Sequence, residues 1–336
     1  MVFLAHAGTQ RISGGLFHQA IAYGEAAVDV FFVVSGFVIA HATARSATGH
    51  DAMGYAIARV ARIYSVVLPC LALGWLLDAT GAALNPALYA AAPQFTGPAG
   101  LADLASSALF LDHVWFRAAQ PGSNLPFWSL AFEAWYYLAF GLLVFAPRPW
   151  NWLGAVAAMA LAGPKIAALF PLWLLGVACQ RHCARGPLPA AAGWLLLLAP
   201  WAVLTFWDPR GQACVPYTPF IADPQCIGAL AYDYGIGLLV AAQLLGVHAL
   251  APVLWRWLSP ISRPVAWLAG ASFTLYLLHY PLLHFIAAAV PWPADHWARR
   301  VLVFLLPPLL ALAVAEFTER RRTAWRRAIA RLAGQR

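Results

Sequence analysis

Apolar blocks long enough to cross a bilayer recur along the whole sequence, separated by short joints that carry Pro, Gly and Arg. A crossing helix needs about 20 mostly apolar residues, and these blocks leave no room for a soluble domain of ordinary size. With 62% hydrophobic and 10% charged residues among 336, the chain lies far from the composition of soluble globular proteins. We therefore expect an all-α, polytopic integral membrane protein with a single transmembrane domain over residues 1–336.

We expect about ten membrane spans, the first of them truncated because too little apolar sequence precedes residue 8. The expected spans are residues 1–8, 26–44, 62–80, 126–146, 150–163, 165–180, 190–207, 229–249, 266–289 and 300–317. The apolar segment 101–116 is shorter. The arginine-bearing loops all fall on the cytoplasmic side only if this segment does not cross the membrane. Residues 80–125 then lie outside or re-enter the membrane.

The arginines predict the orientation of the spans, because short cytoplasmic loops are enriched in Lys and Arg. The joints expected in the cytoplasm carry Arg45, Arg59, Arg62, Arg181, Arg185, Arg256 and Arg263. Both termini and the basic tail over residues 320–336 then lie in the cytoplasm as well. Four arginines fall on the outer side in this scheme, namely Arg11, Arg117, Arg299 and Arg300. Topology thus accounts for the net charge of +8, and we expect no nucleic-acid partner.

The stretch from Glu25 to His41 carries the most informative polar residues. An ionisable group such as Asp29 is costly on a membrane helix and by default faces a protein interior or a water-filled cavity. Ser35 and Gly36 interrupt the same apolar run, and Ser35 lies on a different helix face from Asp29. Two interpretations of the Ser35-Gly36 pair stay open: it belongs to a site, or its small residues let another helix pack closely.

Arg59 and Arg62 lie three residues apart at the start of a span. This spacing places two guanidinium groups on one side of a helix mouth, where they are suited to bind phosphate oxygens in bidentate fashion. The alternative is that they anchor the span by extending towards lipid headgroups.

Ser129, Glu133 and Tyr137 follow one another at four-residue steps on the first turns of another span. A carboxylate flanked by hydroxyl groups inside the membrane is a poor structural element and a reasonable site residue. The neighbouring Trp128 and Tyr136 have a simpler interpretation as aromatic residues at the membrane interface.

A second polar stripe is formed by Ser272, Tyr276 and His279, at positions i, i+4 and i+7 of a later span. Either this stripe lines a cavity, or His279 is a packing residue with a satisfied side chain. His6 is the other histidine of interest. A neutral imidazole accepts a proton at physiological pH, which makes His6 the best candidate for a general base.

Six stretches together resemble the acyltransferase-3 family of bacterial membrane O-acyltransferases, in order and spacing over nearly the whole chain. They read VFLAHAG, VDVFFVVSGFVI, ARVARIYSVVLP, FWSLAFEAWYYL, ASFTLYLLHYPLL and AEFTERRR. The resemblance implies a core of ten membrane helices in the bacterial inner membrane. It also implies transfer of an acyl group, mostly acetyl, from acyl-CoA to hydroxyl groups of envelope polysaccharides, lipopolysaccharide, lipids or antibiotics.

The resemblance also implies roles for individual residues. His6 corresponds to the catalytic histidine of the family's first helix. Arg59 and Arg62 match a cytoplasmic basic pair that engages the coenzyme A phosphates. The recurrent polar positions of the family fall on Asp29, Ser35, Glu133, Tyr276 and His279.

Two positions depart from the family pattern. The family usually carries a basic residue about three helical turns before its first histidine, and this chain begins only five residues before His6. We therefore expect a truncated first helix. Near the C-terminus, Glu319 is followed by Arg320, where the family usually has a proline.

The implied chemistry is the attack of an alcohol on a thioester. A base such as His6 that removes the alcohol proton accelerates this step by about 100- to 10,000-fold. A carboxylate, Asp29 or Glu133, is expected to orient the imidazole, and Ser35 or Tyr276 is expected to donate a hydrogen bond to the oxyanion. We expect no covalent acyl-serine intermediate, because no base is evidently paired with Ser35.

The cysteines do not predict a disulfide framework. Cys179 and Cys183 flank His182 on the expected cytoplasmic side and lack the second ligand pair of a zinc site, so no metal is expected. A disulfide between Cys214 and Cys226 is compatible with an outer loop at 208–228.

Two other classes of function stay open at this stage. A secondary transporter also places ionisable residues inside the membrane, although the sequence shows no paired halves of the kind that transporters use. A truncated, inactive homologue that serves as a scaffold is the other alternative. We expect a membrane-bound O-acyltransferase whose partners are acyl-CoA, a saccharide or lipid-linked saccharide acceptor and membrane lipids.

Overall fold

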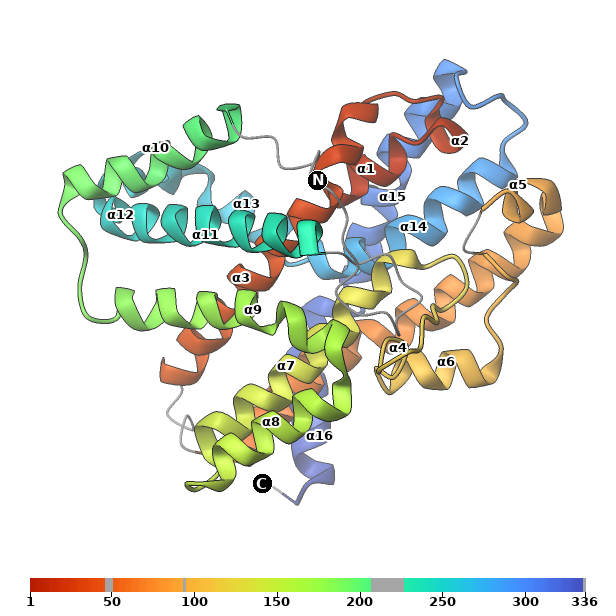
Figure 1. The fold of residues 1–336 in the computed structure, drawn as a ribbon. Helices are drawn as coiled ribbons and strands as arrows, with labels where there is room; N and C mark the ends of the chain where they lie inside the picture. Colours follow the sequence, from red (N-terminus) through yellow and green to blue (C-terminus); the bar gives the residue numbers. More distant parts are fainter. Residues whose placement is uncertain (46–50, 93–94, 207–226, 335–336) are drawn as a thin grey trace.

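The computed structural model describes residues 1–45, 51–92, 95–206 and 227–334, and within these ranges it contains helices and loops without strands (Figure 1). The longer helices are α3 (Gly24–Arg45), α4 (Ala52–Leu84), α7 (Trp128–Phe145), α9 (Pro164–Cys183), α10 (Ala190–Phe206), α11 (Ile227–Ala249), α14 (Ser272–Ala289) and α15 (Trp297–Ala315). The shorter ones are α1 (Val2–Ala7), α2 (Gln10–Ser13), α5 (Pro86–Ala90), α6 (Leu101–Ala108), α8 (Trp150–Ala162), α12 (Ala251–Leu258), α13 (Ser262–Ala269) and α16 (Arg322–Leu332). The described ranges also contain four 3₁₀ turns, namely η1 (His18–Tyr23), η2 (Leu125–Phe127), η4 (Ser259–Ile261) and η5 (Glu319–Arg321).

Seven helical stretches of the described residues are long and apolar enough to cross a membrane, so the predicted class of a polytopic helical membrane protein is confirmed. They are His18–Ala44, Ala52–Leu84, Leu125–Phe145, Pro164–Cys183, Leu230–Ala249, Ser272–Ala289 and Trp297–Leu332. The predicted number of ten spans is not confirmed. The stretches expected at 150–163 and 190–207 form the shorter apolar helices α8 and α10, and residues 1–8 form only the six-residue α1.

Several boundaries differ from the expected ones for local reasons. The helix expected at 62–80 extends over 33 residues because its first turn is capped by Asp51, whose carboxylate accepts from two backbone N–H groups. The stretch expected at 266–289 breaks at Gly270 into α13 and α14. The segment 101–116 contains only the eight-residue α6, which is too short to cross a bilayer.

Two glycines let α3 and α9 approach closely. A Cβ atom at Gly36 would overlap the backbone carbonyl of Trp173, and one at Gly176 would overlap the carbonyl of Val33. Close packing on small residues is typical of helices in membranes, where no hydrophobic driving force exists between helices. The Ser35-Gly36 pair therefore does serve packing through its glycine, as one of the two open interpretations proposed.

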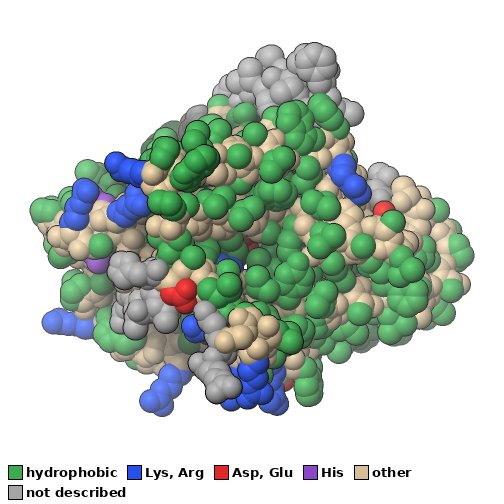
Figure 2. Space-filling view, turned by 90° about the horizontal axis from the view of Figure 1, so that it is seen from below, with side chains coloured by type: hydrophobic (Ala, Val, Ile, Leu, Met, Phe, Trp, Pro, Cys, Tyr) green, Lys and Arg blue, Asp and Glu red, His purple; other side chains and the backbone are tan. Residues whose placement is uncertain are grey.

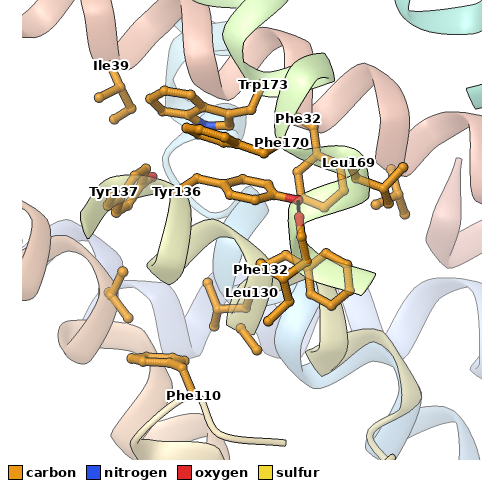
Figure 3. Close-up of a cluster of buried hydrophobic side chains, with 14 of the residues drawn as sticks. Phe32, Ile39, Phe110, Leu130, Phe132, Tyr136, Tyr137, Leu169, Phe170 and Trp173 are labelled. Atoms are coloured by element: carbon orange, nitrogen blue, oxygen red, sulfur yellow. Dashed lines mark hydrogen bonds between the residues drawn. The ribbon is translucent and has the colours of Figure 1, made fainter. Parts of the chain in front are cut away.

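A cluster of buried aromatic side chains fills the space between α3, α7 and α9 (Figure 3). The rings of Phe32 and Tyr136 are T-shaped with centroids 5.5 Å apart, and Tyr136 lies 5.1 Å from Phe170. The Tyr136 hydroxyl donates to the carbonyl of Ile166 over 2.8 Å. Tyr136 is therefore a core residue here rather than an interfacial one, and the cluster fixes the three helices that carry Ser35, Glu133 and Trp173.

α14 is the central element for the site, since it packs against α4, α15, α1 and α2. α16, which forms most of the predicted tail, packs along α4 and buries none of its residues. α1 and α2 lie at the end of the bundle opposite to α16 (Figure 1). Viewed from the end where α16 lies, the surface is largely apolar, with Lys and Arg side chains distributed around it (Figure 2).

Candidate active site

His6 of α1 and His279 of α14 are hydrogen-bonded in the interior of the bundle. His6 Nδ1 lies 2.9 Å from His279 Nε2, and the two rings are stacked. On its other side, His279 Nδ1 lies 2.8 Å from the carbonyl oxygen of Tyr276. Because a carbonyl oxygen only accepts, Nδ1 of His279 carries the proton and its Nε2 accepts. His6 therefore donates through Nδ1, which leaves its Nε2 with a free lone pair.

Pro281 explains why a loop residue is needed to complete α14 beside His279. A proline has no N–H, so the carbonyl of Leu277, four residues earlier, lacks its helical donor. Asn124 Nδ2 lies 2.9 Å from this carbonyl oxygen and donates to it instead. Asn124 is buried, and its own Oδ1 has no hydrogen-bond partner in the part of the chain that the structure describes.

Tyr276 and Ser272, the other two members of the polar stripe on α14, have different surroundings. The Tyr276 hydroxyl lies 3.0 Å from the carbonyl oxygen of Pro126 and 2.6 Å from Ser129 Oγ. Ser129 Oγ lies 3.3 Å from the same carbonyl oxygen, so one hydroxyl donates to the backbone and the other donates to its neighbouring hydroxyl. Ser272 is exposed, and its hydroxyl donates to the carbonyl of Ala269. Ser272 was expected to line a cavity, but its side chain lies outside the interior.

Ser35, Glu133 and Tyr137 form a buried hydrogen-bond network. Ser35 Oγ donates to Glu133 Oε1 over 2.5 Å, and the Tyr137 hydroxyl donates to the same oxygen over 2.6 Å. Trp173 Nε1 in turn donates to Ser35 Oγ over 3.2 Å. The hydroxyl hydrogens of Ser35 and Tyr137 are thus both engaged by one carboxylate. Ser35 had no evident partner in the sequence, and in the structure Glu133 of α7 accepts its hydroxyl hydrogen.

Arg59 and Arg62 lie beside this network. The guanidinium carbon of Arg59 lies 5.7 Å from the ring centroid of Tyr137, and that of Arg62 lies 5.8 Å from the ring centroid of Phe273. Both guanidinium groups are within electrostatic range of the Glu133 carboxylate. The predicted placement of the two arginines on one side of a helix is therefore consistent with the structure, and that side faces the bundle.

Three clusters lie in sequence along α14. Arg62 contacts Phe273 near the start of the helix, His6 contacts His279 in the middle, and Arg11 contacts His284 further on. At about 1.5 Å per residue, Phe273 lies about 9 Å before His279 along the helix axis, and His284 lies about 7.5 Å after it. The histidine pair thus lies between two groups of basic side chains.

Asp29 is buried and lies near Asp233 of α11, with Glu25 within electrostatic range of both. Three carboxyl groups therefore gather at this end of α3, where ionisable groups are costly inside a membrane. Asp233 was missed by the sequence analysis, although a carboxylate inside an apolar span is the signal that singled out Asp29.

The group that contacts the imidazole of His6 differs from the expected one. Asp29 lies near Asp233 and Glu133 accepts from Ser35, whereas the ring of His6 is hydrogen-bonded to His279. Spacing along a helix cannot reveal such a contact, because His6 and His279 lie at opposite ends of the chain.

Glu319 caps the start of α14. Its Oε2 accepts from the backbone N–H groups of Phe273 and Thr274, over 3.1 and 3.2 Å. These donors have no helical partner at a helix N-terminus, and a carboxylate there is favourable. Arg320, the residue that departs from the family pattern, lies over the ring of Trp267 and donates to its carbonyl.

The cysteines take little part in the site. Cys179 and Cys183 are buried and free. Cys214 and Cys226 lie outside the residues that the structure describes. Within the described ranges no group of three His, Cys, Asp or Glu side chains is arranged to hold a metal ion.

Fold and site together define a class: a polytopic helical membrane protein with a part-buried histidine pair between two basic clusters. The family model described as "Acyltransferase domain", that of the acyltransferase-3 family, matches residues 1–316, and the chain belongs to this family. Neither a curated protein nor a solved structure gives a match to the chain.

Proposed function

We propose that the chain is an O-acyltransferase that moves an acyl group, acetyl as the first expectation, from acyl-CoA to a hydroxyl of a cell-envelope saccharide or glycolipid. The observation that carries this proposal is the hydrogen bond between His6 and His279. The backbone carbonyl on His279 fixes the tautomers, so that His6 Nε2 is available as a base.

In the proposed reaction, His6 Nε2 takes the proton of the acceptor hydroxyl as the alcohol oxygen attacks the thioester carbonyl carbon. The resulting tetrahedral intermediate collapses with cleavage of the carbon–sulfur bond. The coenzyme A thiolate leaves and recovers the proton from the His6 imidazolium, so the products are an ester and free coenzyme A. His279 holds the ring of His6 in place and, through its Nε2, accepts from the imidazolium as it forms.

Arg59 and Arg62 are proposed to bind the phosphates of acyl-CoA. They carry two of the charges of the expected cytoplasmic side, and guanidinium groups match phosphate geometry. Glu133, with Ser35 and Tyr137 as its donors, holds the two arginines on the bundle side of α4. Asp29 and Asp233 are proposed to lie on the acceptor side, where carboxyl groups are hydrogen-bond partners for hydroxyl groups.

The test is mass spectrometry of envelope glycans and glycolipids, before and after mild base treatment. The strains lack the gene or are complemented with the wild type, His6→Ala or a surface control such as Arg331→Gln in α16. We expect a base-labile acyl mass that disappears on deletion, returns with the wild type and the control, and does not return with His6→Ala.

Three results contradict the proposal. Full restoration by His6→Ala removes His6 as the base. A deletion strain whose glycans are unchanged, in cells that accumulate or lose a small solute instead, favours the secondary transporter. If the His6→Ala strain restores an envelope activity that another protein carries out, the result favours an inactive homologue that serves as a scaffold.

A further inference from the structure

Arg11 places a guanidinium group inside the end of the bundle that lies opposite to α16. Its Nη2 lies 2.9 Å from His284 Nε2, and because a guanidinium only donates, the histidine accepts. The His284 ring in turn lies against the ring of Tyr280, with centroids 4.6 Å apart. A carboxylate is the ordinary partner of a partly buried arginine, and here the partner is a neutral ring.

Two hydrogen-bond donors of this cluster are unsatisfied. Arg11 Nη1 and His284 Nδ1 are both buried and have no hydrogen-bond partner within the described part of the chain. Since His284 Nε2 accepts from Arg11, the proton of the neutral imidazole lies on Nδ1, so this atom is also a donor. Buried donors without acceptors are costly and rare in native proteins, so each calls for an acceptor such as a water molecule, an ion or a group of a ligand.

The structure fixes this arginine in position. Arg299 of α15 is buried and donates to the carbonyls of Arg11 and Ile12 over 2.7 and 3.0 Å. Arg300 donates to the carbonyl of Ser13 over 2.9 Å. Arg299 and Arg300, two exceptions to the expected arginine distribution, therefore have a structural reason, since they hold α2. Among the described residues, the Arg11 guanidinium group makes its hydrogen bond to a side chain, that of His284, and not to the backbone.

The position of Arg11 along α14 separates it from the reacting atoms. His284 follows His279 by five residues, which corresponds to about 7.5 Å along the helix axis. The donor-side arginine, Arg62, lies in the other direction from His279. The ring of Tyr280 lies between the two places, with its centroid 4.5 Å from that of His6 and 4.6 Å from that of His284. A group bound by Arg11 therefore lies about one side-chain ring away from the base, on the side of α2.

We propose that Arg11 and His284 form an anion-binding subsite for the acceptor, so that the accepted molecule carries a carboxylate or phosphate group near the hydroxyl that is acylated. This inference rests on the proposed function, which assigns the Arg11 side of the histidine pair to the acceptor and the Arg62 side to acyl-CoA. A uronic acid and a sugar phosphate supply the same chemistry, two or more anionic oxygens for a forked donor.

The experiment uses the full chain in dodecyl maltoside and three matched probes, octyl β-D-glucoside, octyl β-D-glucuronide and octyl β-D-glucoside 6-phosphate. Binding is measured as the probe concentration that raises the thermal unfolding midpoint half-maximally. Acetyl transfer from acetyl-CoA to each probe is measured in parallel by mass spectrometry. The variants are Arg11→Gln, Arg11→Lys and His6→Ala, and each is first checked for a single species by size-exclusion chromatography.

For the wild type we expect at least one anionic probe to bind about 10- to 100-fold more tightly than the neutral one, the range of a charge-assisted hydrogen bond. Arg11→Gln loses this preference without a change for the neutral probe, and His6→Ala keeps it. The anionic probe that is preferred tells carboxylate from phosphate. If Arg11→Gln does not fold, the test uses Arg11→Lys instead. We expect its preference for the anionic probe to be several-fold smaller than that of the wild type, because lysine lacks the forked N–H donors of a guanidinium group.

Equal binding of all three probes to the wild type overturns the subsite, and so does a preference that the Arg11 variant retains in full. A failure of the proposed function looks different, because the anionic preference then persists while no probe is acetylated. Acetylation of the neutral and anionic probes with equal binding contradicts the subsite alone.

Discussion

Asn124 donates its side-chain amide to the carbonyl oxygen of Leu277, over 2.9 Å, at the one position where Pro281 leaves α14 without a backbone donor. The bond joins a loop at the start of α7 to the helix that carries His279. It lies two residues from that histidine, so its loss shifts the ring against His6.

The first prediction concerns this bond. Asn124→Ala leaves the Leu277 carbonyl unsatisfied, and we expect a loss of about 1–3 kcal/mol in the free energy of unfolding together with a lower rate of acyl transfer. Pro281→Ala restores an N–H group for that carbonyl. In the double variant, the unfolding midpoint and the rate should recover towards those of Pro281→Ala alone. Additive effects of the two substitutions would contradict the compensation.

Much of the architecture follows from the sequence because membrane helices are predicted from local composition. The blocks that became α3, α7, α9 and α11 were located to within a few residues. The exceptions have local causes that composition does not report, such as the Asp51 cap and the break at Gly270. The number of spans was not confirmed, since α1, α8 and α10 are short.

The candidate site was predicted residue by residue but not contact by contact. His6, Glu133 and His279 were singled out because ionisable groups are costly inside a membrane. Their partners depend on which helices pack together, and helical spacing relates only residues of one helix. The His6–His279 pair joins residues separated by 273 positions, and the Ser35–Glu133 pair joins residues separated by 98. Asn124, a polar loop residue before a span, gave no signal of this kind.

The second prediction concerns the tautomer of His6. His279→Leu removes the acceptor of the His6 Nδ1 proton, so we expect the rate constant kcat for acyl transfer to fall about 10- to 100-fold. His279→Gln offers a carbonyl oxygen as the acceptor and should retain more activity than His279→Leu. The measurement is kcat against pH for both variants. Equal losses for the two substitutions, with an unchanged pH profile, would indicate a packing role for His279.

The third prediction concerns donor binding. Arg59→Gln and Arg62→Gln should each raise the KM for acetyl-CoA by about tenfold or more, because each removes charge-assisted hydrogen bonds to phosphate. Acetyl-pantetheine, which has the same thioester and lacks the nucleotide phosphates, serves as the matched substrate. Its KM should be unchanged by both substitutions. An equal rise for both donors would assign the arginines to the fold and to Glu133.

The fourth prediction concerns the contact between α3 and α9. Gly36→Ala places a methyl group against the Trp173 carbonyl and forces the helices apart, which also lengthens the hydrogen bond from Trp173 to Ser35. We expect a lower unfolding midpoint and a loss of folded protein in detergent. Gly154→Ala in α8 is the control, since its added methyl group would make only ordinary contacts at 3.5 Å and beyond. Similar midpoints for the two variants would rule out close packing at Gly36 as the reason for the glycine.

The fifth prediction concerns Asp112, in the loop after α6 and outside the membrane-spanning helices. Its side chain is 1% exposed, neither carboxylate oxygen has a hydrogen-bond partner among the described residues, and burial raises the pKa of the carboxyl to about 6. The unfolded chain has a carboxyl pKa of about 3.9. Between these values the folded state binds more protons than the unfolded state. The contribution of this group to stability therefore falls as the pH rises from 4 to 6 and stays low above pH 6.

We expect Asp112→Asn to be more stable than the wild type at pH 7.5, by about 1–3 kcal/mol in the free energy of unfolding. At pH 4.5 the unfolding midpoints of the two proteins should be closer together. An offset between the two proteins that does not change with pH would show that the Asp112 carboxyl does not titrate in this range.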